Sequence, residues 1–166
     1  MAALLIAHIC LICSLFAPCH PGAALRDLGK SSRFQGTSMS VPAIHEDDAE
    51  ALGLAGRELR WLIARTAVPA KHCSTCVIRV APGDKVTPAH SHPNGEEVIY
   101  IIQGSGRVLV GGEVQPVRAG MAVLFPQGVV HMLHNTGSEE MKVVCFFAPP
   151  TGLENYRMHE GVDFPD

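Results

Sequence analysis

Residues 83–104, GDKVTPAHSHPNGEEVIYIIQG, decide how the rest of the chain is interpreted. His90 and His92 are one residue apart, and a β-strand points such a pair toward the same face. Pro93-Asn94-Gly95 is typical of a turn, and a pair of carboxylates ending at Glu97 leads from it into an apolar, β-branched run. Neutral imidazole and carboxylate are good ligands for divalent first-row metals. The stretch therefore predicts most of a metal site, brought together across a turn.

The rest of the sequence alternates short apolar runs with turn signals and shows almost no helical period, which is typical of an antiparallel sandwich or barrel. The expected strands cover residues 59–68, 76–80, 97–103, 107–110, 113–117, 121–125, 129–134 and 140–148. A short acidic helix is expected at 44–53. Residues 153–166 form a tail that either folds over one end of the barrel or trails off. A second segment, 120–135, adds His131 to the candidate site.

Two spaced motifs in the sequence resemble those of the cupin family. The first consists of Gly83, His90, His92, Glu97 and Gly104, with one extra residue between Gly83 and His90. The second consists of Gly120, Pro126, Gly128, His131 and Asn135. The resemblance covers about residues 76–148. It implies an all-β jelly-roll barrel (a double-stranded β-helix) and a divalent metal held by His90, His92, Glu97 and His131.

Length and charge indicate one domain, which we place at residues 39–166. The formal charge is −3 and no basic block is present, whereas nucleic-acid binding usually needs a basic stripe. Residues 1–38 are open to two interpretations. The apolar run within residues 1–24 resembles a secretory signal, which predicts a secreted or periplasmic protein without a membrane segment after cleavage. A start near Met39 instead predicts a cytoplasmic protein.

The cysteines do not form the disulfide framework of a small secreted domain. Three of them lie in the leader, which leaves the odd set Cys73, Cys76 and Cys145. The lone Cys73-x-x-Cys76 pair lacks the second pair of a structural zinc site, and residues three apart on a strand face opposite ways. We interpret these thiols as core residues, with a redox role as the alternative.

Strand parity assigns a direction to the side chains near the site. The inward set comprises Glu97, Ile99, Ile101 and Gln103. Tyr100 is expected to face outward. His134 is three residues from His131 and should point away from the metal. Asn135 is expected to secure a turn rather than to contact substrate.

We expect a metal-dependent enzyme that acts on a small oxygen-bearing organic substrate. Four protein ligands on an octahedral ion leave two positions, for substrate together with dioxygen or water. The ligands suit Fe, Mn, Ni, Co or Zn, and we favour iron and a dioxygenase-type reaction, because the inward positions are mostly apolar. Glu97 is the candidate catalytic side chain. The alternatives are a redox-neutral isomerase or lyase, in which a tyrosine or Glu97 moves protons, and a non-catalytic protein that binds metal and ligand.

A homodimer is also expected. Single-domain cupins are commonly dimers, which the resemblance extends to this chain. The apolar strand around Trp61 is the candidate edge for pairing between subunits.

Overall fold

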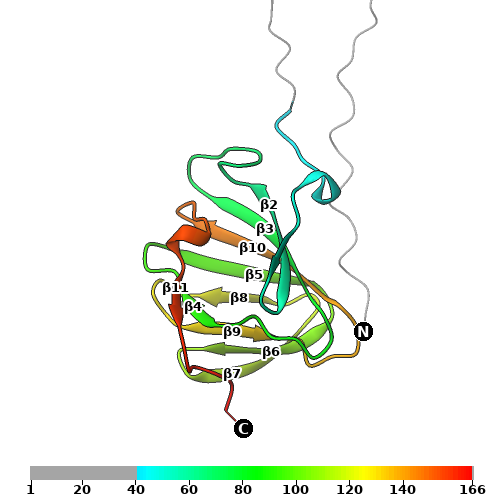
Figure 1. Ribbon diagram of the computed structural model, residues 1–166, viewed down its shortest axis with the longest axis vertical. Helices are drawn as coiled ribbons and strands as arrows, with labels where there is room; N and C mark the ends of the chain where they lie inside the picture. Colours follow the sequence, from blue (N-terminus) through cyan, green and yellow to red (C-terminus); the bar gives the residue numbers. More distant parts are fainter. Residues whose placement is uncertain (1–40, 166) are drawn as a thin grey trace, which may run out of the picture. The chain divides into compact units, whose positions relative to one another are not determined.

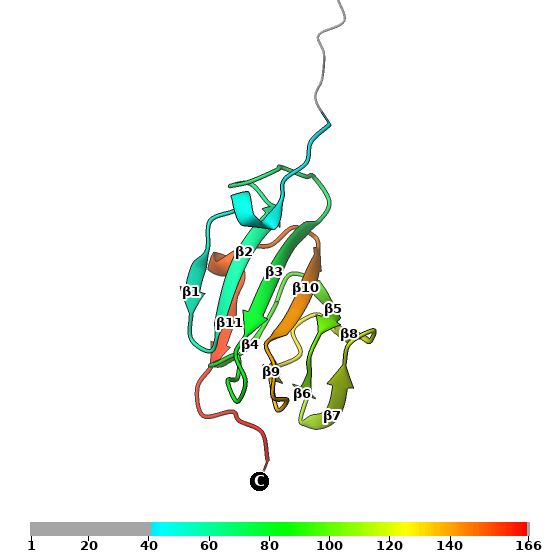
Figure 2. The same cartoon turned by 90° about the vertical axis from the view of Figure 1, so that its right-hand side faces the viewer.

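The computed structural model describes residues 41–165, which form two antiparallel sheets that face each other (Figure 1, Figure 2). The larger sheet has the order β1 (Leu52–Leu54), β2 (Arg57–Ile63), β3 (Ser74–Val80), β10 (Met141–Ala148), β5 (Glu96–Gln103) and β8 (Ala122–Phe125). The smaller sheet has the order β11 (Arg157–His159), β4 (Ala89–Ser91), β9 (His131–His134), β6 (Ser105–Val110) and β7 (Glu113–Arg118). This is the expected all-β jelly roll. The leader and its three cysteines lie outside the described residues.

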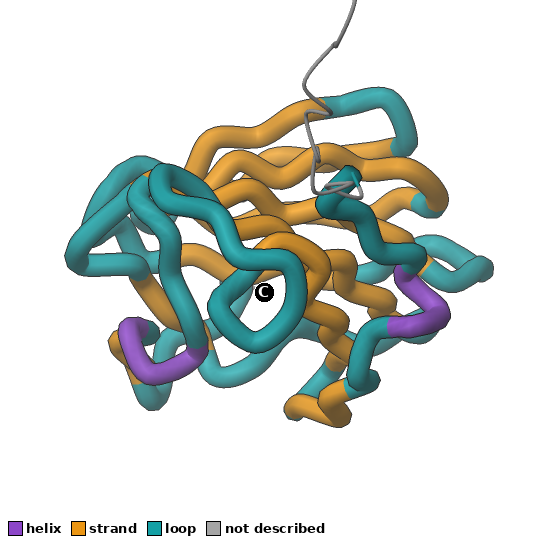
Figure 3. Tube along the Cα trace, turned by 90° about the horizontal axis from the view of Figure 1, so that it is seen from above, coloured by secondary structure: helices purple, strands orange, loops and turns teal. Residues whose placement is uncertain are grey.

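The strands surround a shared interior when viewed from above (Figure 3). Strand β5 illustrates how side chains reach this interior. Glu97, Ile99 and Ile101 point inward and are buried, while the residues between them are exposed. The buried apolar side chains that fill the interior include Leu59, Ile78, Val80, Val108, Phe125, Leu133, Met141, Val143 and Phe147. The two sheets therefore pack against one main core, and a second, smaller cluster joins Ala89, Leu109 and Met132 of the smaller sheet to Phe164.

The inward expectation for Gln103 is wrong. Lys142 pairs with Gln103, but Val143 pairs with Ile101, so a bulge leaves Ile102 without a partner. An extra residue of this kind changes the side-chain parity beyond it. Both Ile102 and Gln103 are consequently exposed.

Two elements near the start of the domain also differ from expectation. The helix predicted at 44–53 is limited to the 3-10 turn η1 (Glu46–Asp48), because Leu52–Leu54 form β1. The strand predicted at 59–68 ends at Ile63 and pairs with β1 on its outer side. β1 pairs only with Arg57–Leu59, so among residues 41–165 Trp61 has a strand partner on the β3 side alone, and pairing between subunits at this edge stays a prediction. No helix within residues 41–165 is long and apolar enough to cross a membrane.

Candidate metal centre

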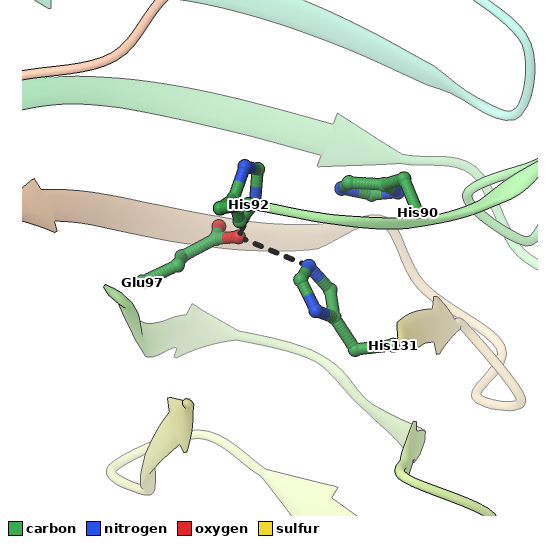
Figure 4. A group of neighbouring side chains, drawn as sticks. All are labelled: His90, His92, Glu97 and His131. Atoms are coloured by element: carbon green, nitrogen blue, oxygen red, sulfur yellow. Dashed lines mark hydrogen bonds and ion pairs between the residues drawn. The ribbon is translucent and has the colours of Figure 1, made fainter. Parts of the chain in front are cut away.

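Four buried side chains converge between the sheets: His90 on β4, His92 just after it, Glu97 on β5 and His131 on β9 (Figure 4). Each contributes one potential ligand atom, and these atoms all lie within 4.8 Å of one another. The structure thus brings together every residue of the ligand set expected from the sequence.

Strand register explains why residues from the two motifs meet. His90 and His131 are direct partners in the β4–β9 pair, so their side chains emerge on the same face. The turn that precedes β9 is fastened to the first motif, because the Gly128 amide donates to the His92 carbonyl oxygen at 3.0 Å. Glu97 arrives from the facing sheet, where it lies between Phe125 and Phe147 in the register.

The Glu97 carboxylate is the centre of the cluster. Glu97 Oε2 lies 2.8 Å from His92 Nε2 and 3.3 Å from His131 Nε2 (Figure 4). Two ligand atoms at right angles around an ion with bonds of about 2.1 Å are roughly 3 Å apart. The observed separations therefore suit neighbouring ligands of one divalent ion.

The tautomer of His131 supports the same fit. Its Nδ1 donates to the Val129 carbonyl oxygen at 2.9 Å, so in the neutral ring Nε2 is the nitrogen that has a lone pair and can bind a metal. Among residues 41–165, His131 Nε2 and the Nδ1 atoms of His90 and His92 are buried without a hydrogen-bond partner. Buried polar nitrogens rarely lack partners, and a cation between them would satisfy the orphaned lone pair of His131.

Charge also favours a cation at this point. Burial by itself raises the pKa of the Glu97 carboxyl, but contacts with His131 and His92 outweigh burial and hold the pKa below its ordinary value. Burial, aided by the charge of His131, lowers the pKa of His90 to about 3, so His90 is neutral at physiological pH. In the described part of the chain no Lys or Arg forms an ion pair with Glu97. A buried carboxylate without a cation is costly, and a divalent ion would compensate it.

Tyr156, which sequence reasoning did not single out, covers the cluster. Its ring stacks on His90 with centroids 4.9 Å apart and rings 7° from parallel, and it meets the His92 ring edge-on at 4.4 Å. The tail folds over the barrel here because β11 pairs with β4, placing Met158 opposite His90. Burial and the charge of Glu97 raise the pKa of the Tyr156 phenol, which therefore stays protonated. A lone tyrosine in an apparently loose tail gave no signal for this placement.

A small cavity of about 20 Å³ adjoins the cluster. Its wall is mostly apolar. The lining residues are Leu59, Ile78, Val86, Ile99, Phe125 and Leu133, together with Arg57, Cys76, Cys145, Tyr156 and the candidate ligands His90, Glu97 and His131. Such a volume accommodates about one water molecule. A larger ligand therefore requires movement of a covering side chain such as Tyr156.

The neighbouring residues follow the sequence expectations with one exception. His134 lies outside the cluster and its Nδ1 accepts from Arg107, so its outward direction is confirmed. Asn135 secures its turn through Gly137 and Glu139, as expected, and it also donates to the Val80 carbonyl oxygen at the end of β3; it is not part of the cluster. Cys76 and Cys145 are buried and directly opposite in the β3–β10 register. Cys73 is exposed because it precedes β3, so its assignment to the core is wrong.

Comparisons with known proteins place the chain in a family. Residues 76–147 match the model of the cupin domain. The protein SchB of Streptomyces halstedii is 31% identical over 68% of this chain and 81% of its own length. The polyketide synthase CurC of Streptomyces cyaneus is 31% identical over 57% of this chain, and the match spans only 60% of CurC. The crystal structure of Lactobacillus farciminis oxalate decarboxylase in a formate complex has a TM-score of 0.65 at 21% identity, covering 76% of this chain and 39% of that one.

The sequence relatives, the matched domain and the shared fold agree with the two motifs and with the jelly roll that they build. The chain therefore belongs to the cupin superfamily, as a small cupin-domain protein.

Proposed function

We propose that this protein is a metal-dependent enzyme that acts on a small oxygen-bearing organic substrate, with the ion held by His90, His92, Glu97 and His131. The observation that carries the proposal is the buried Glu97 carboxylate, which lies among three imidazoles and has no Lys or Arg paired with it among residues 41–165. A bound divalent ion would act as a Lewis acid on a substrate oxygen. The similarity to CurC, which is named a polyketide synthase, supports small-molecule chemistry.

Redox-neutral chemistry of the isomerase or lyase type is supported best within this class. Tyr156 stacks on His90 and keeps its proton, so its Oη is a proton donor beside the cluster. Both contacts of Glu97 with histidines use Oε2, which leaves Oε1 as a candidate acceptor for a substrate proton. The chain therefore supplies an acid and a base close together. The expectation of a dioxygenase came from the mostly apolar inward positions, whereas this acid and base favour redox-neutral chemistry.

A dioxygenase-type reaction is the second candidate, and the cavity favours it. A space of about 20 Å³ with mostly apolar walls suits a diatomic gas better than a polar co-substrate. In this case iron is the expected metal, because it binds dioxygen as well as substrate oxygens.

Turnover with and without air distinguishes these candidates. The protein is loaded with Fe²⁺ or Zn²⁺ and incubated with a panel of small hydroxy and keto compounds, and products are followed by NMR and oxygen uptake. The first candidate predicts anaerobic turnover that Tyr156→Phe lowers roughly 100-fold. Tyr100→Phe is the matched control, because Tyr100 is exposed on the outer face of β5. Turnover that requires dioxygen and survives Tyr156→Phe supports the dioxygenase, and tight binding without turnover supports a non-catalytic role.

We further propose a homodimer that pairs through the outer face of the larger sheet. Large apolar side chains with exposed fractions of 38–49% gather there on β5, β8 and β10, namely Val98, Tyr100, Ile102, Leu124 and Phe146. Val98 lies opposite both Phe146 and Leu124 in the register, so these three are contiguous. Contiguous exposed apolar side chains are typical of a protein interface.

A further inference from the structure

Arg57 is a cationic side chain directed at the cavity beside the metal centre. It alternates on β2 with Leu59 and Trp61, which both pack in the core, so parity points it inward. It lines the same cavity as His90, Glu97 and Tyr156.

The backbone around Arg57 is held closely. Arg57 follows the tight turn between β1 and β2, where a Cβ on Gly56 would lie 1.8 Å from the Lys85 carbonyl oxygen. The Thr87 amide donates to the Ala55 carbonyl oxygen at 3.4 Å, which fastens the same turn to the loop that leads to His90. Arg57 thus starts from a fixed position at the wall of the cavity.

The guanidinium of Arg57 has no ion-pair or hydrogen-bond partner within residues 41–165, although it is half-buried. The other half-buried cations all have one: Arg60 pairs with Glu58, Arg79 and Lys142 pair with Glu46, Lys85 pairs with Asp163, and Arg107 contacts His134 and Phe164. Glu97 lines the same cavity but makes its close contacts with histidines. An arginine removed from water normally satisfies its donors with an anion.

We propose that Arg57 binds the carboxylate of a small anionic substrate whose other oxygen faces the metal centre. The planar fork of the guanidinium matches a carboxylate with two parallel hydrogen bonds. Because the cavity of about 20 Å³ holds about one water molecule, such a substrate reaches Arg57 when a covering side chain such as Tyr156 moves aside. The inference rests on the proposed function and deepens it, because it names the substrate class as small carboxylic acids that bear a second oxygen.

A matched pair of probes tests the proposal without knowledge of the true substrate. Glycolate and glycolamide carry the same hydroxyl oxygen for the metal, but only glycolate presents a carboxylate anion to Arg57. Binding of each to the Co²⁺-loaded protein is measured from the change in the visible spectrum of the metal. We expect Arg57→Gln to weaken glycolate binding roughly 10- to 100-fold, the cost of one charge-assisted pair, with glycolamide changed less than about 2-fold.

Arg157→Gln is the control variant, since it removes the same charge from an exposed position on β11 beside β4. We expect it to leave both affinities within about 2-fold of wild type. Equal loss of both probes in Arg57→Gln, or no loss of either, overturns the role of Arg57. So does absence of glycolate binding to the metal-loaded wild type up to about 50 mM. Failure of Co²⁺ to bind at all instead refutes the proposed metal centre, so the two failures are distinguishable.

Discussion

Asn135 is the polar side chain whose removal should damage the fold most clearly. It is fully buried, and its Nδ2 donates to the carbonyl oxygens of Val80 and Glu139, each at 2.8 Å. Its Oδ1 accepts from the Gly137 amide at 3.0 Å. The backbone of Asn135 also joins β9 to the loop before His90, since its carbonyl oxygen accepts from Gly83. This one residue therefore connects the two motifs of the candidate site.

Replacing Asn135 with alanine removes three hydrogen bonds, one to the buried Val80 carbonyl oxygen and two part-buried ones to the Glu139 carbonyl oxygen and the Gly137 amide. At about 1 kcal/mol for each lost bond, the expected loss in free energy of unfolding is about 3 kcal/mol. For a domain of this size that corresponds to a fall in Tm of about 10 °C. Urea unfolding followed by fluorescence of Trp61, the only tryptophan in the chain, measures the change.

Asn94→Ala provides the control, because Asn94 is exposed in the turn after His92. It should change stability by less than about 0.5 kcal/mol. A loss below about 1 kcal/mol in Asn135→Ala, or equal losses in both variants, would refute the view that the Asn135 side chain fastens the motifs together.

Three further predictions concern other parts of the fold. The hydrogen bond from Lys142, with the charges of Lys142 and Arg79, lowers the pKa of Glu46 below its ordinary 4.5 despite opposing desolvation. In urea titrations at pH 7, Glu46→Gln should therefore be less stable than wild type by up to about 1 kcal/mol. The difference in stability should vanish as the pH falls below 4.5 through the folded-state pKa of Glu46. A difference that stays constant with pH would contradict this. Gly106→Ala places a Cβ 2.0 Å from the His134 carbonyl oxygen and should cost about 2–4 kcal/mol in thermal unfolding, whereas Gly53→Ala meets nothing within 4 Å and should be nearly neutral. In sedimentation at micromolar concentration, Phe146→Asp should yield monomers while Val162→Asp, exposed elsewhere, stays dimeric; a monomeric wild type would exclude the dimer.

The sequence was sufficient for the barrel and for the convergence of the four candidate ligands. Period-two alternation specifies a strand's buried face locally, so Glu97, Ile99 and Ile101 could be oriented without a structure. Glycine positions were equally informative: Gly104 has a φ of 86°, and a Cβ there would lie 2.8 Å from the Met141 Cα. Only glycine tolerates that conformation and that approach, which makes the motif spacing a physical constraint.

Features that depend on contacts distant in the chain could not be predicted. The bulge opposite Lys142 reverses the direction of Gln103, and no local pattern in β5 announces it. Tyr156 reaches the site because three tail residues pair with β4, and such a short strand carries no periodic signal. Arg57 lies outside the strand expected at 59–68, whereas β2 begins at Arg57, and alternation with Leu59 and Trp61 directs it inward. Two of the residues that matter most for substrate chemistry were therefore visible only in three dimensions.

Metal content of the purified protein tests the central claim most directly. Elemental analysis is made on protein prepared without added metal. The test variant is His92→Ala, and the control is His45→Ala, because the His45 side chain is largely exposed and lies outside the cluster. We predict about one divalent transition-metal ion per chain in wild type and in His45→Ala, and at least a 10-fold lower content in His92→Ala. Full retention of metal by His92→Ala, or no metal in any preparation even after loading, would contradict the account.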